Sequence, residues 1–239
     1  MTKEEYTAIE SYMLSCMAES AHDREHVYRV LYLALDIAST EPAADRDVLV
    51  AAALLHDVGR PEQQADQRLD HALVGAQKAE AFLRSRGYEE GFIARVCECI
   101  RCHRFRRSRP PESIEAKILF DADKLDVCGA TGIARTLQYG GSLGCPLYHR
   151  DAEGHISDGS EGHDGKIDAA SVSFFQEYHY KLEKLYDRFL TRRGKELALR
   201  RQKAAKDFYE ALLAEVREPE ERFADDVRLK ERPMFDQSS

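Results

Sequence analysis

The residues of this chain best suited to chemistry are His56 and Asp57, an imidazole and a carboxylate side by side at the end of an apolar segment. Residues 51–55 are all alanine or leucine, which predicts a buried helix. Burying both polar side chains without compensation would cost a large free energy. A divalent cation would supply that compensation, because neutral imidazole and ionised carboxylate are ordinary ligands of zinc, manganese and iron.

Two further ligand candidates lie far from this pair in the sequence. His26 stands upstream and Asp123 downstream, so the candidates occur in the order His, His-Asp, Asp. The dipeptide alone carries little weight, since His163-Asp164 repeats it in the same chain. The ordered set carries more, because four such ligands leave an octahedral ion with open positions, as a catalytic site requires.

The ordered set resembles the HD-domain superfamily of metal-dependent phosphohydrolases. Residues 122–126 (Ala-Asp-Lys-Leu-Asp) and 129–135 (Gly-Ala-Thr-Gly-Ile-Ala-Arg) extend the resemblance to the small stand-alone YedJ/YpgQ branch. The resemblance covers the chain from about residue 17 to about residue 217. It implies four metal ligands, which are His26, His56, Asp57 and Asp123.

The resemblance also implies one divalent metal ion and a hydrolytic reaction. Manganese is favoured, with iron, nickel, cobalt, zinc or magnesium as alternatives, because the ligands are nitrogen and oxygen without a thiolate. The metal is expected to lower the pKa of its bound water and to neutralise charge on a phosphoryl group. We therefore expect hydrolysis of a phosphate ester or anhydride of a small metabolite, with nucleotides as the favoured class.

Three residues near the expected ligands are catalytic candidates together with the aspartate of the His-Asp pair. Lys124 follows Asp123, so its ammonium group is expected to hold a phosphate oxygen as a point charge. Arg60 lies one helical turn after the pair and is a candidate for the same role, where some HD phosphatases carry a glutamate. His22 lies one turn before His26, either lining the pocket or standing exposed in the first turn of a helix.

His71, His103 and Arg104 are candidates for binding phosphate or a second metal. Both histidines match positions where the YedJ/YpgQ branch carries histidines, and the alternative is a pair of helix-face histidines bonded to backbone. Arg104 is one of five arginines within residues 101–109 of an otherwise acidic chain. Such arginines either stabilise the negative end of a helix or bind a substrate phosphate.

A rival motif overlaps one of these histidines. Residues 99–103 (Cys-Ile-Arg-Cys-His) fit the C-x-x-C-H pattern of covalent haem attachment, and a thiolate metal site is a related alternative. The helical spacing of Ile93, Val96 and Ile100 favours buried helix cysteines instead. The acidic N-terminus, which differs from an export signal, favours the same interpretation.

Composition narrows the class of protein further. The chain has 239 residues, 43% hydrophobic and 33% charged, and no apolar run near the roughly 18 to 20 residues that span a bilayer. Its net charge of -8 disfavours a general nucleic-acid surface. Six cysteines without an export signal indicate reduced thiols, so we expect a cytoplasmic protein without a membrane anchor.

The apolar spacing is helical throughout and predicts an all-α fold. Together with this spacing, the resemblance implies an HD-domain helical bundle in one domain over residues 1–217. The predicted core is 20–140, with helices over 3–19, 22–40, 46–58, 70–86, 89–105, 113–126 and 128–139. A glycine-rich loop is expected over 140–170, helices over 171–191 and 194–217, and a polar tail over 218–239. The two C-terminal helices leave a homo-oligomer open.

Two other functions compete with hydrolysis. Some HD proteins hold two irons and oxidise their substrates with O₂, which would require His71 and His103 as ligands of a second metal. A metal-stabilised module that binds nucleotides or a partner without turnover is the other alternative. Metal content separates the first alternative from hydrolysis, and product release separates the second.

Overall fold

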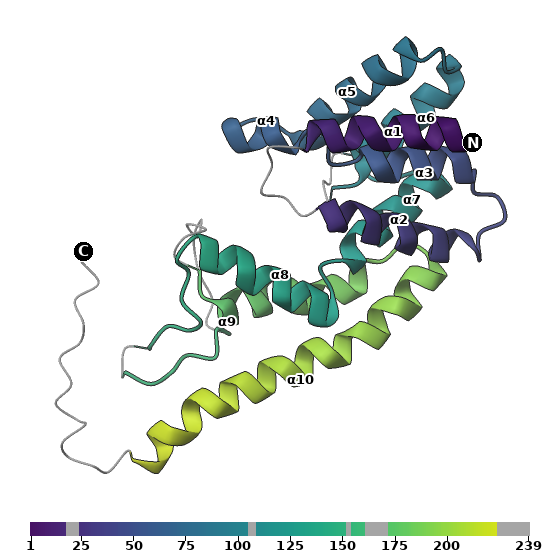
Figure 1. The fold of residues 1–239 in the computed structure, drawn as a ribbon. Helices are drawn as coiled ribbons and strands as arrows, with labels where there is room; N and C mark the ends of the chain where they lie inside the picture. The colour runs from purple at the N-terminus through teal and green to yellow at the C-terminus, as the bar shows by residue number, and fades with distance from the viewer. Residues whose placement is uncertain (18–23, 105–108, 152–153, 161–171, 224–239) are drawn as a thin grey trace.

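A computed structural model of the chain describes residues 1–17, 24–104, 109–151, 154–160 and 172–223. Its helices are α1 (Lys3–Cys16), α2 (Arg24–Ala38), α3 (Arg46–Leu55), α4 (Arg60–Ala65), α5 (His71–Ser85), α6 (Glu90–Cys102), α7 (Ile114–Leu125), α8 (Gly129–Ser142), α9 (Phe174–Glu177) and α10 (Arg192–Arg222). The one β-type pairing within the described residues is a bridge between Arg150 and Ile156. The expected all-α fold is confirmed (Figure 1).

Helix α3 forms the centre of the core. The carboxylate of Asp45 caps its first turn by accepting from the backbone N–H of Asp47 at 3.0 Å, and residues 51–55 are fully buried. The helix packs against α1, α2, α6 and α7, which explains why its sequence is apolar on nearly every side. His56 is its C-cap, so the polar pair stands at the end of a deeply buried helix.

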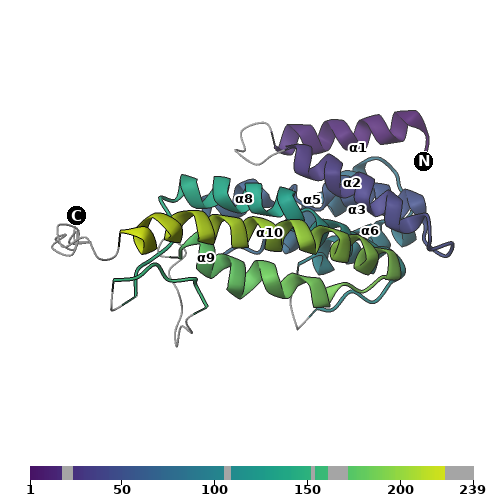
Figure 2. The same cartoon turned by 90° about the horizontal axis from the view of Figure 1, so that it is seen from below.

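The other helices surround α3 in two groups. Helices α2 and α7 pack against each other, and α6 packs between α3 and α5. Helix α10 packs against α8 and α7, and Figure 2 shows α8, α9 and α10 running alongside one another on the side away from α1. The chain ends of several helices meet inside the core around α3. They are the C-terminal ends of α3, α6 and α7 and the N-terminal end of α2.

Gly59 allows the chain to turn sharply after the His-Asp pair. A β-carbon at this position would lie 2.4 Å from the backbone oxygen of His71 and 2.5 Å from the backbone nitrogen of Gly75, which is too close for any side chain. The turn between α3 and α4 therefore rests directly on the first turns of α5. This contact brings the end of α3 next to His71.

Several predicted boundaries were wrong. Helix α4 was not expected, and none of its residues is buried, so it lacks the apolar spacing that reveals a helix. The segment predicted as one helix over 171–191 contains α9, a π-helical turn (Tyr178–Leu182) and a 3-10 turn (Glu183–Arg188) within its described part. Helix α8 extends past 139 to Ser142, and α10 passes residue 217 and ends at Arg222.

The described part of the glycine-rich segment is bound to α10. Arg150 pairs with Glu220, the Tyr209 hydroxyl donates to the Asp158 carbonyl at 2.7 Å, and Arg217 Nη2 donates to the Ile156 carbonyl at 2.7 Å. These bonds hold Arg150, Ile156 and Asp158 against the C-terminal half of α10. Within the predicted loop, residues 152–153 and 161–170 lie outside the described residues.

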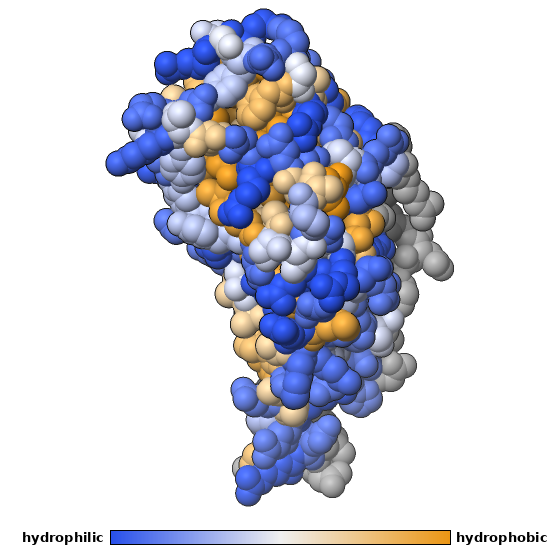
Figure 3. Space-filling model, turned by 90° about the vertical axis from the view of Figure 1, so that its right-hand side faces the viewer, coloured by the Kyte–Doolittle hydropathy of each residue, from blue (hydrophilic) through white to orange (hydrophobic). Residues whose placement is uncertain are grey.

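The surface agrees with the high proportion of charged residues. The face in Figure 3 is mostly hydrophilic, and hydrophobic side chains show there in separate patches. Among the helices that the structure describes, none combines the length and the apolar character needed to cross a membrane.

Candidate metal centre

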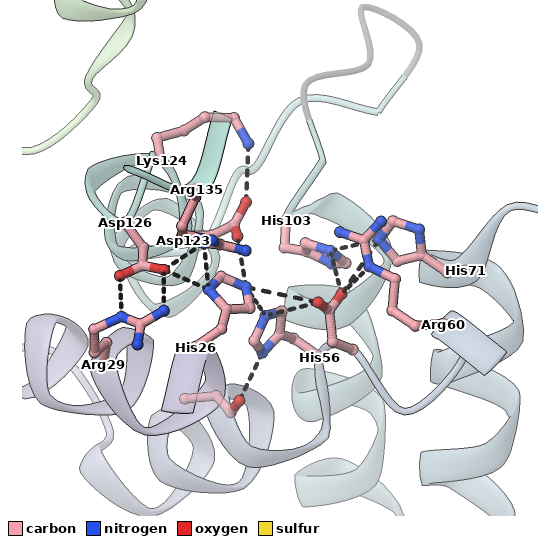
Figure 4. A network of polar contacts seen from close by, with 12 residues as sticks. His26, Arg29, His56, Arg60, His71, His103, Asp123, Lys124, Asp126 and Arg135 are labelled. Atoms are coloured by element: carbon pink, nitrogen blue, oxygen red, sulfur yellow. Dashed lines mark hydrogen bonds and ion pairs between the residues drawn. The ribbon is translucent and has the colours of Figure 1, made fainter. Parts of the chain in front are cut away.

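Three ligand candidates converge from helices that are far apart in the sequence. His26 lies in the first turn of α2, His56 caps α3, and Asp123 lies in the last turn of α7. His26 Nε2 is 3.4 Å from His56 Nε2 and 3.4 Å from Asp123 Oδ1. We call His26, His56 and Asp123 the first ligand group (Figure 4).

His71 and His103 form a second ligand group with Asp57. Their Nε2 atoms are 3.2 Å apart, and Asp57 Oδ1 lies 3.3 Å from His71 Nε2 and 3.7 Å from His103 Nε2. The other carboxylate oxygen, Asp57 Oδ2, lies 3.6 Å from His26 Nε2 and 3.7 Å from His56 Nε2. The Asp57 carboxylate therefore stands between the two groups, with one oxygen facing each.

Each of the four imidazoles is held through its Nδ1 atom. The Nδ1–H groups of His56 and His103 donate to the carbonyls of Ala53 and Ile100, three residues earlier, at 2.7 Å each. These carbonyls belong to helix ends, where they have no intrahelical partner. The histidines thus satisfy the ends of α3 and α6 and turn their Nε2 atoms toward Asp57.

Side chains hold the other two imidazoles. His26 Nδ1–H donates to Asp126 Oδ2 at 2.8 Å, and His71 Nδ1–H donates to Gln63 Oε1 at 2.6 Å. The Gln63 amide nitrogen donates to the Leu69 carbonyl, which fixes the amide oxygen toward His71. With each Nδ1 bound to an acceptor, the Nε2 atoms face the centre; those of His56, His71 and His103 carry lone pairs, and that of His26 does so once its second proton is lost.

These donors fit a metal ion. The Nε2 atoms of His71 and His103 lie 3.2 Å apart and those of His26 and His56 lie 3.4 Å apart, next to carboxylate oxygens. Such close nitrogens need a positive charge between them, which a metal ion would supply and which a proton on His26 supplies before metal binds. Nitrogen and oxygen donors oriented by outer hydrogen bonds are what a transition metal requires. Both ligand groups meet this requirement, so the residues present fit a divalent metal.

Asp126 is buried and contacts His26 on the side away from the ligand atoms. Asp126 was not among the site residues expected from the sequence. Arg29 Nε donates to its Oδ1 at 2.7 Å, and Arg135 also binds this carboxylate. Burial alone would raise the pKa of Asp126, but hydrogen bonds from His26 and Arg29 lower it. A signal was present in the sequence, because Asp126 follows Asp123 by three residues and so lies on the same side of the helix end.

Neighbouring positive charges keep the two ligand carboxylates, Asp57 and Asp123, in the ionised form that binds metal. Burial alone would raise the pKa of both Asp57 and Asp123, but His56 and Arg60 near the first, and Lys124 near the second, hold the two pKa values well below the usual range. Both carboxylates are therefore ionised at neutral pH.

The histidines differ in their affinity for protons. Burial lowers the pKa of His71 to about 2 and that of His103 to about 4, so both are neutral near pH 7. Burial also lowers the pKa of His56. For His26 burial acts in the same direction, but hydrogen bonds with Asp123 and Asp126 outweigh it and raise the pKa to about 9.

The expected cationic residues occupy different positions around the centre. Lys124 Nζ lies 2.9 Å from Asp123 Oδ2, and Arg60 Nε lies 3.0 Å from Asp57 Oδ1, so both contact ligand carboxylates. Figure 4 shows them on opposite sides of the centre.

Arg104 contacts a carboxylate that is not one of the proposed ligands. Its Nη1 donates at 3.1 Å to Asp70, the N-cap of α5, and so it lies beside the start of the helix that carries His71. The remaining catalytic candidate, His22, lies outside the described residues, as do Arg106 and Arg107.

The cysteine motif belongs to the hydrophobic core. Cys97, Cys99 and Cys102 are buried free thiols, and burial raises the pKa of each. His103 of the same motif points toward Asp57. Among the described residues, neither ligand group includes a cysteine, which agrees with the interpretation as buried helix cysteines.

Comparisons with known proteins agree with the residues and with the fold. Residues 24–128 match the family model described as HD domain, a range that contains both ligand groups. The chain is 33% identical to YpgQ of Bacillus subtilis (strain 168) over 183 residues, which are 75% of this chain and 77% of that protein.

Solved structures extend the similarity. The crystal structure of Bacillus subtilis YpgQ gives a TM-score of 0.67 at 27% identity, covering 89% of this chain and 96% of that chain. An HD-superfamily hydrolase from Bacillus thuringiensis gives 0.65 at 28% identity, with coverages of 89% and 97%. YpgQ in complex with ADP gives 0.65 at 27% identity, with coverages of 87% and 93%.

Proposed function

Because the chain belongs to the HD-domain superfamily, we propose that it is a metal-dependent phosphohydrolase that acts on a small phosphorylated metabolite. The observation that carries this proposal is the convergence of imidazole nitrogens and carboxylate oxygens from α2, α3 and α7, which lie within 4.8 Å of one another. The YpgQ complex with ADP supports a nucleotide as the substrate class.

The four proposed ligands are His26, His56, Asp57 and Asp123. A divalent ion held there, with manganese favoured, would activate water and offset the negative charge of a phosphoryl group. The chain's own contribution is to fix these side chains before substrate arrives. His26, His56 and Asp57 are buried, and outer hydrogen bonds hold the two imidazoles, so little reorganisation accompanies the reaction.

Lys124 and Arg60 are the proposed phosphate-binding residues. Their side chains are partly exposed, at 16% and 28%, and they contact carboxylates of Asp123 and Asp57 that are 14% and 4% exposed. Each therefore places part of its charge toward solvent at the edge of the centre. Lysine would bind a phosphate oxygen as a point charge, and arginine would bind two oxygens of one phosphate.

The second ligand group keeps the di-iron oxygenase as an alternative. His71, His103 and Asp57 offer three protein ligands, which suffice for a second metal. If the second group holds no metal during turnover, its neutral imidazoles remain close to the substrate phosphate. Oxygen uptake and phosphate release distinguish the two reactions directly.

The test is a screen of nucleotides and phosphate esters with manganese, iron, nickel, cobalt, zinc and magnesium in turn. Phosphate, pyrophosphate and oxygen consumption are read separately. We expect release of phosphate or pyrophosphate without oxygen consumption, and a loss of more than about 100-fold in Asp57→Asn and His56→Ala. His155→Ala is the matched control, because the His155 side chain is 78% exposed and forms its ion pair with Asp151, which is not one of the proposed ligands.

Oxygen uptake with two irons per chain would favour the oxygenase. Nucleotide binding without turnover, with every metal tested, would favour the non-catalytic module.

A further inference from the structure

Arg60 binds the carboxylate oxygen that belongs to the second ligand group. Its Nε donates to Asp57 Oδ1 at 3.0 Å, and this oxygen faces His71 and His103. The guanidinium is a permanent charge, because arginine does not lose its proton in proteins. The second group is therefore already partly neutralised by a residue of the chain.

Lys124 contacts the first ligand group in a different way. It contacts Asp123 Oδ2, whereas Asp123 Oδ1 is the oxygen that faces His26. The ligand oxygen of the first group thus carries no contact with Lys124. Arg60 therefore contacts the carboxylate oxygen that faces the histidines of its ligand group, whereas Lys124 contacts the carboxylate oxygen that does not.

Helix α4 fixes Arg60 in this position. Arg60 Nη1 lies 3.5 Å from Gln63 Oε1, the same oxygen that accepts the Nδ1–H of His71. One helical turn therefore supplies both the residue that orients an imidazole of the second group and the cation next to it. A metal ion entering the second group would lie among buried ligands next to this partly exposed guanidinium, and the two positive charges would repel each other.

We propose that Arg60 makes the two ligand groups unequal, so that the first group binds a divalent ion tightly and the second binds one only weakly. This inference rests on the proposed metal-dependent function and specifies its metal stoichiometry. One tightly bound ion is sufficient for hydrolysis, whereas the oxygenase alternative needs two.

The test is a calorimetric titration of Mn²⁺ into the full chain, with bound metal counted by elemental analysis. For the wild type we expect one tight site and a second site at least about tenfold weaker. In Arg60→Gln, which removes the charge, the second site tightens by at least about tenfold, and adding His71→Ala abolishes it again. Arg60→Lys keeps the charge and the weak second site.

The matched control is Arg68→Gln. Arg68 pairs with Asp66 at the surface just after α4, so its removal leaves both affinities unchanged. Circular dichroism of each variant verifies that it is folded, and the ratio of the two wild-type affinities tests the inference without any variant.

Two equally tight sites in the wild type would overturn the inference. So would an Arg60→Gln variant whose second site stays as weak as before, and in that case the first site and the proposed function would stand. A wild-type chain that binds no Mn²⁺ at all would overturn the proposed function together with the inference.

Discussion

At the residue scale, the outer nitrogen of each imidazole determines what the inner nitrogen can bind. Asp126 illustrates this most clearly, because its buried carboxylate orients His26 and is itself held by Arg29 and Arg135. A carboxylate behind a ligating histidine fixes the tautomer and makes the imidazole a stronger ligand. We therefore regard Asp126 as a positioning residue of the centre.

Asp126→Asn tests this role. The amide keeps the size of the side chain but loses the charge, so we expect the affinity for Mn²⁺ to fall by about 10- to 100-fold. Competition with a chelator measures the affinity. Asp36→Asn is the control, because Asp36 pairs with Arg193 at the surface. An unchanged Mn²⁺ affinity in Asp126→Asn would show that the carboxylate does not tune His26.

The raised pKa of His26 predicts a pH dependence of metal binding. Before metal binds, His26 is protonated below a pKa of about 9, and the metal must displace that proton. A higher pH removes the competing proton, so affinity rises with pH, by about tenfold per unit between pH 6 and pH 8. Titration of Mn²⁺ at several pH values measures this slope. A flat profile would contradict the protonated state of His26.

At the element scale, the predicted helices carry the strongest apolar spacing, and the missed features lack it. Helices α2, α3, α5, α6 and α7 bury one face or more, so their existence was readable. Helix α4 buries none of its residues, and Gln63, the partner of His71, lies on it. A hydrogen bond between side chains on different helices leaves no spacing in the sequence.

The C-terminal segment was mispredicted for a related reason. Asp121 of α7 accepts the backbone N–H groups of Leu190 and Thr191 at 2.9 and 2.7 Å, which fixes where the chain turns into α10. Such a contact across 69 or more residues overrides local helix propensity, and the residues before it form π and 3-10 turns. The four proposed ligands could be named from the sequence because each lies at or next to an end of an apolar helix and because their order resembles that of the HD-domain superfamily.

Gly59 links the element scale to the centre. In Gly59→Ala the new methyl group would clash with backbone atoms of His71 and Gly75, which cannot move independently of α5. We expect the free energy of unfolding to fall by about 1–3 kcal/mol. Denaturant titration measures this value.

Gly91→Ala is the control for this substitution. Gly91 lies at the start of α6 with no atom within 4 Å of an added β-carbon, so the change should be neutral or slightly stabilising. Equal stabilities of the Gly59→Ala variant and the wild type would contradict the close packing of the turn on α5.

At the scale of the whole molecule, the centre ties together five helices of the core. The ligand candidates come from the α2, α3, α5, α6 and α7 regions, which make up the core around α3. A metal bound to the folded chain and not to the unfolded chain stabilises the fold by mass action.

We therefore expect Mn²⁺ at about 100 times its Kd to raise the melting temperature by roughly 5–10 °C, which corresponds to about 2.7 kcal/mol. Differential scanning fluorimetry with and without a chelator measures the shift. His56→Ala should lose most of it, while His155→Ala should retain it. A shift of the same size in both variants would place the metal elsewhere.

The most direct test of the account is the release of phosphate or pyrophosphate from nucleotides by the Mn²⁺-loaded wild type and by Asp57→Asn, measured side by side. We predict turnover by the wild type that a chelator abolishes and that Asp57→Asn lacks. A fully metal-loaded wild type that hydrolyses none of the nucleotides or phosphate esters, or an Asp57→Asn variant as active as the wild type, would contradict it.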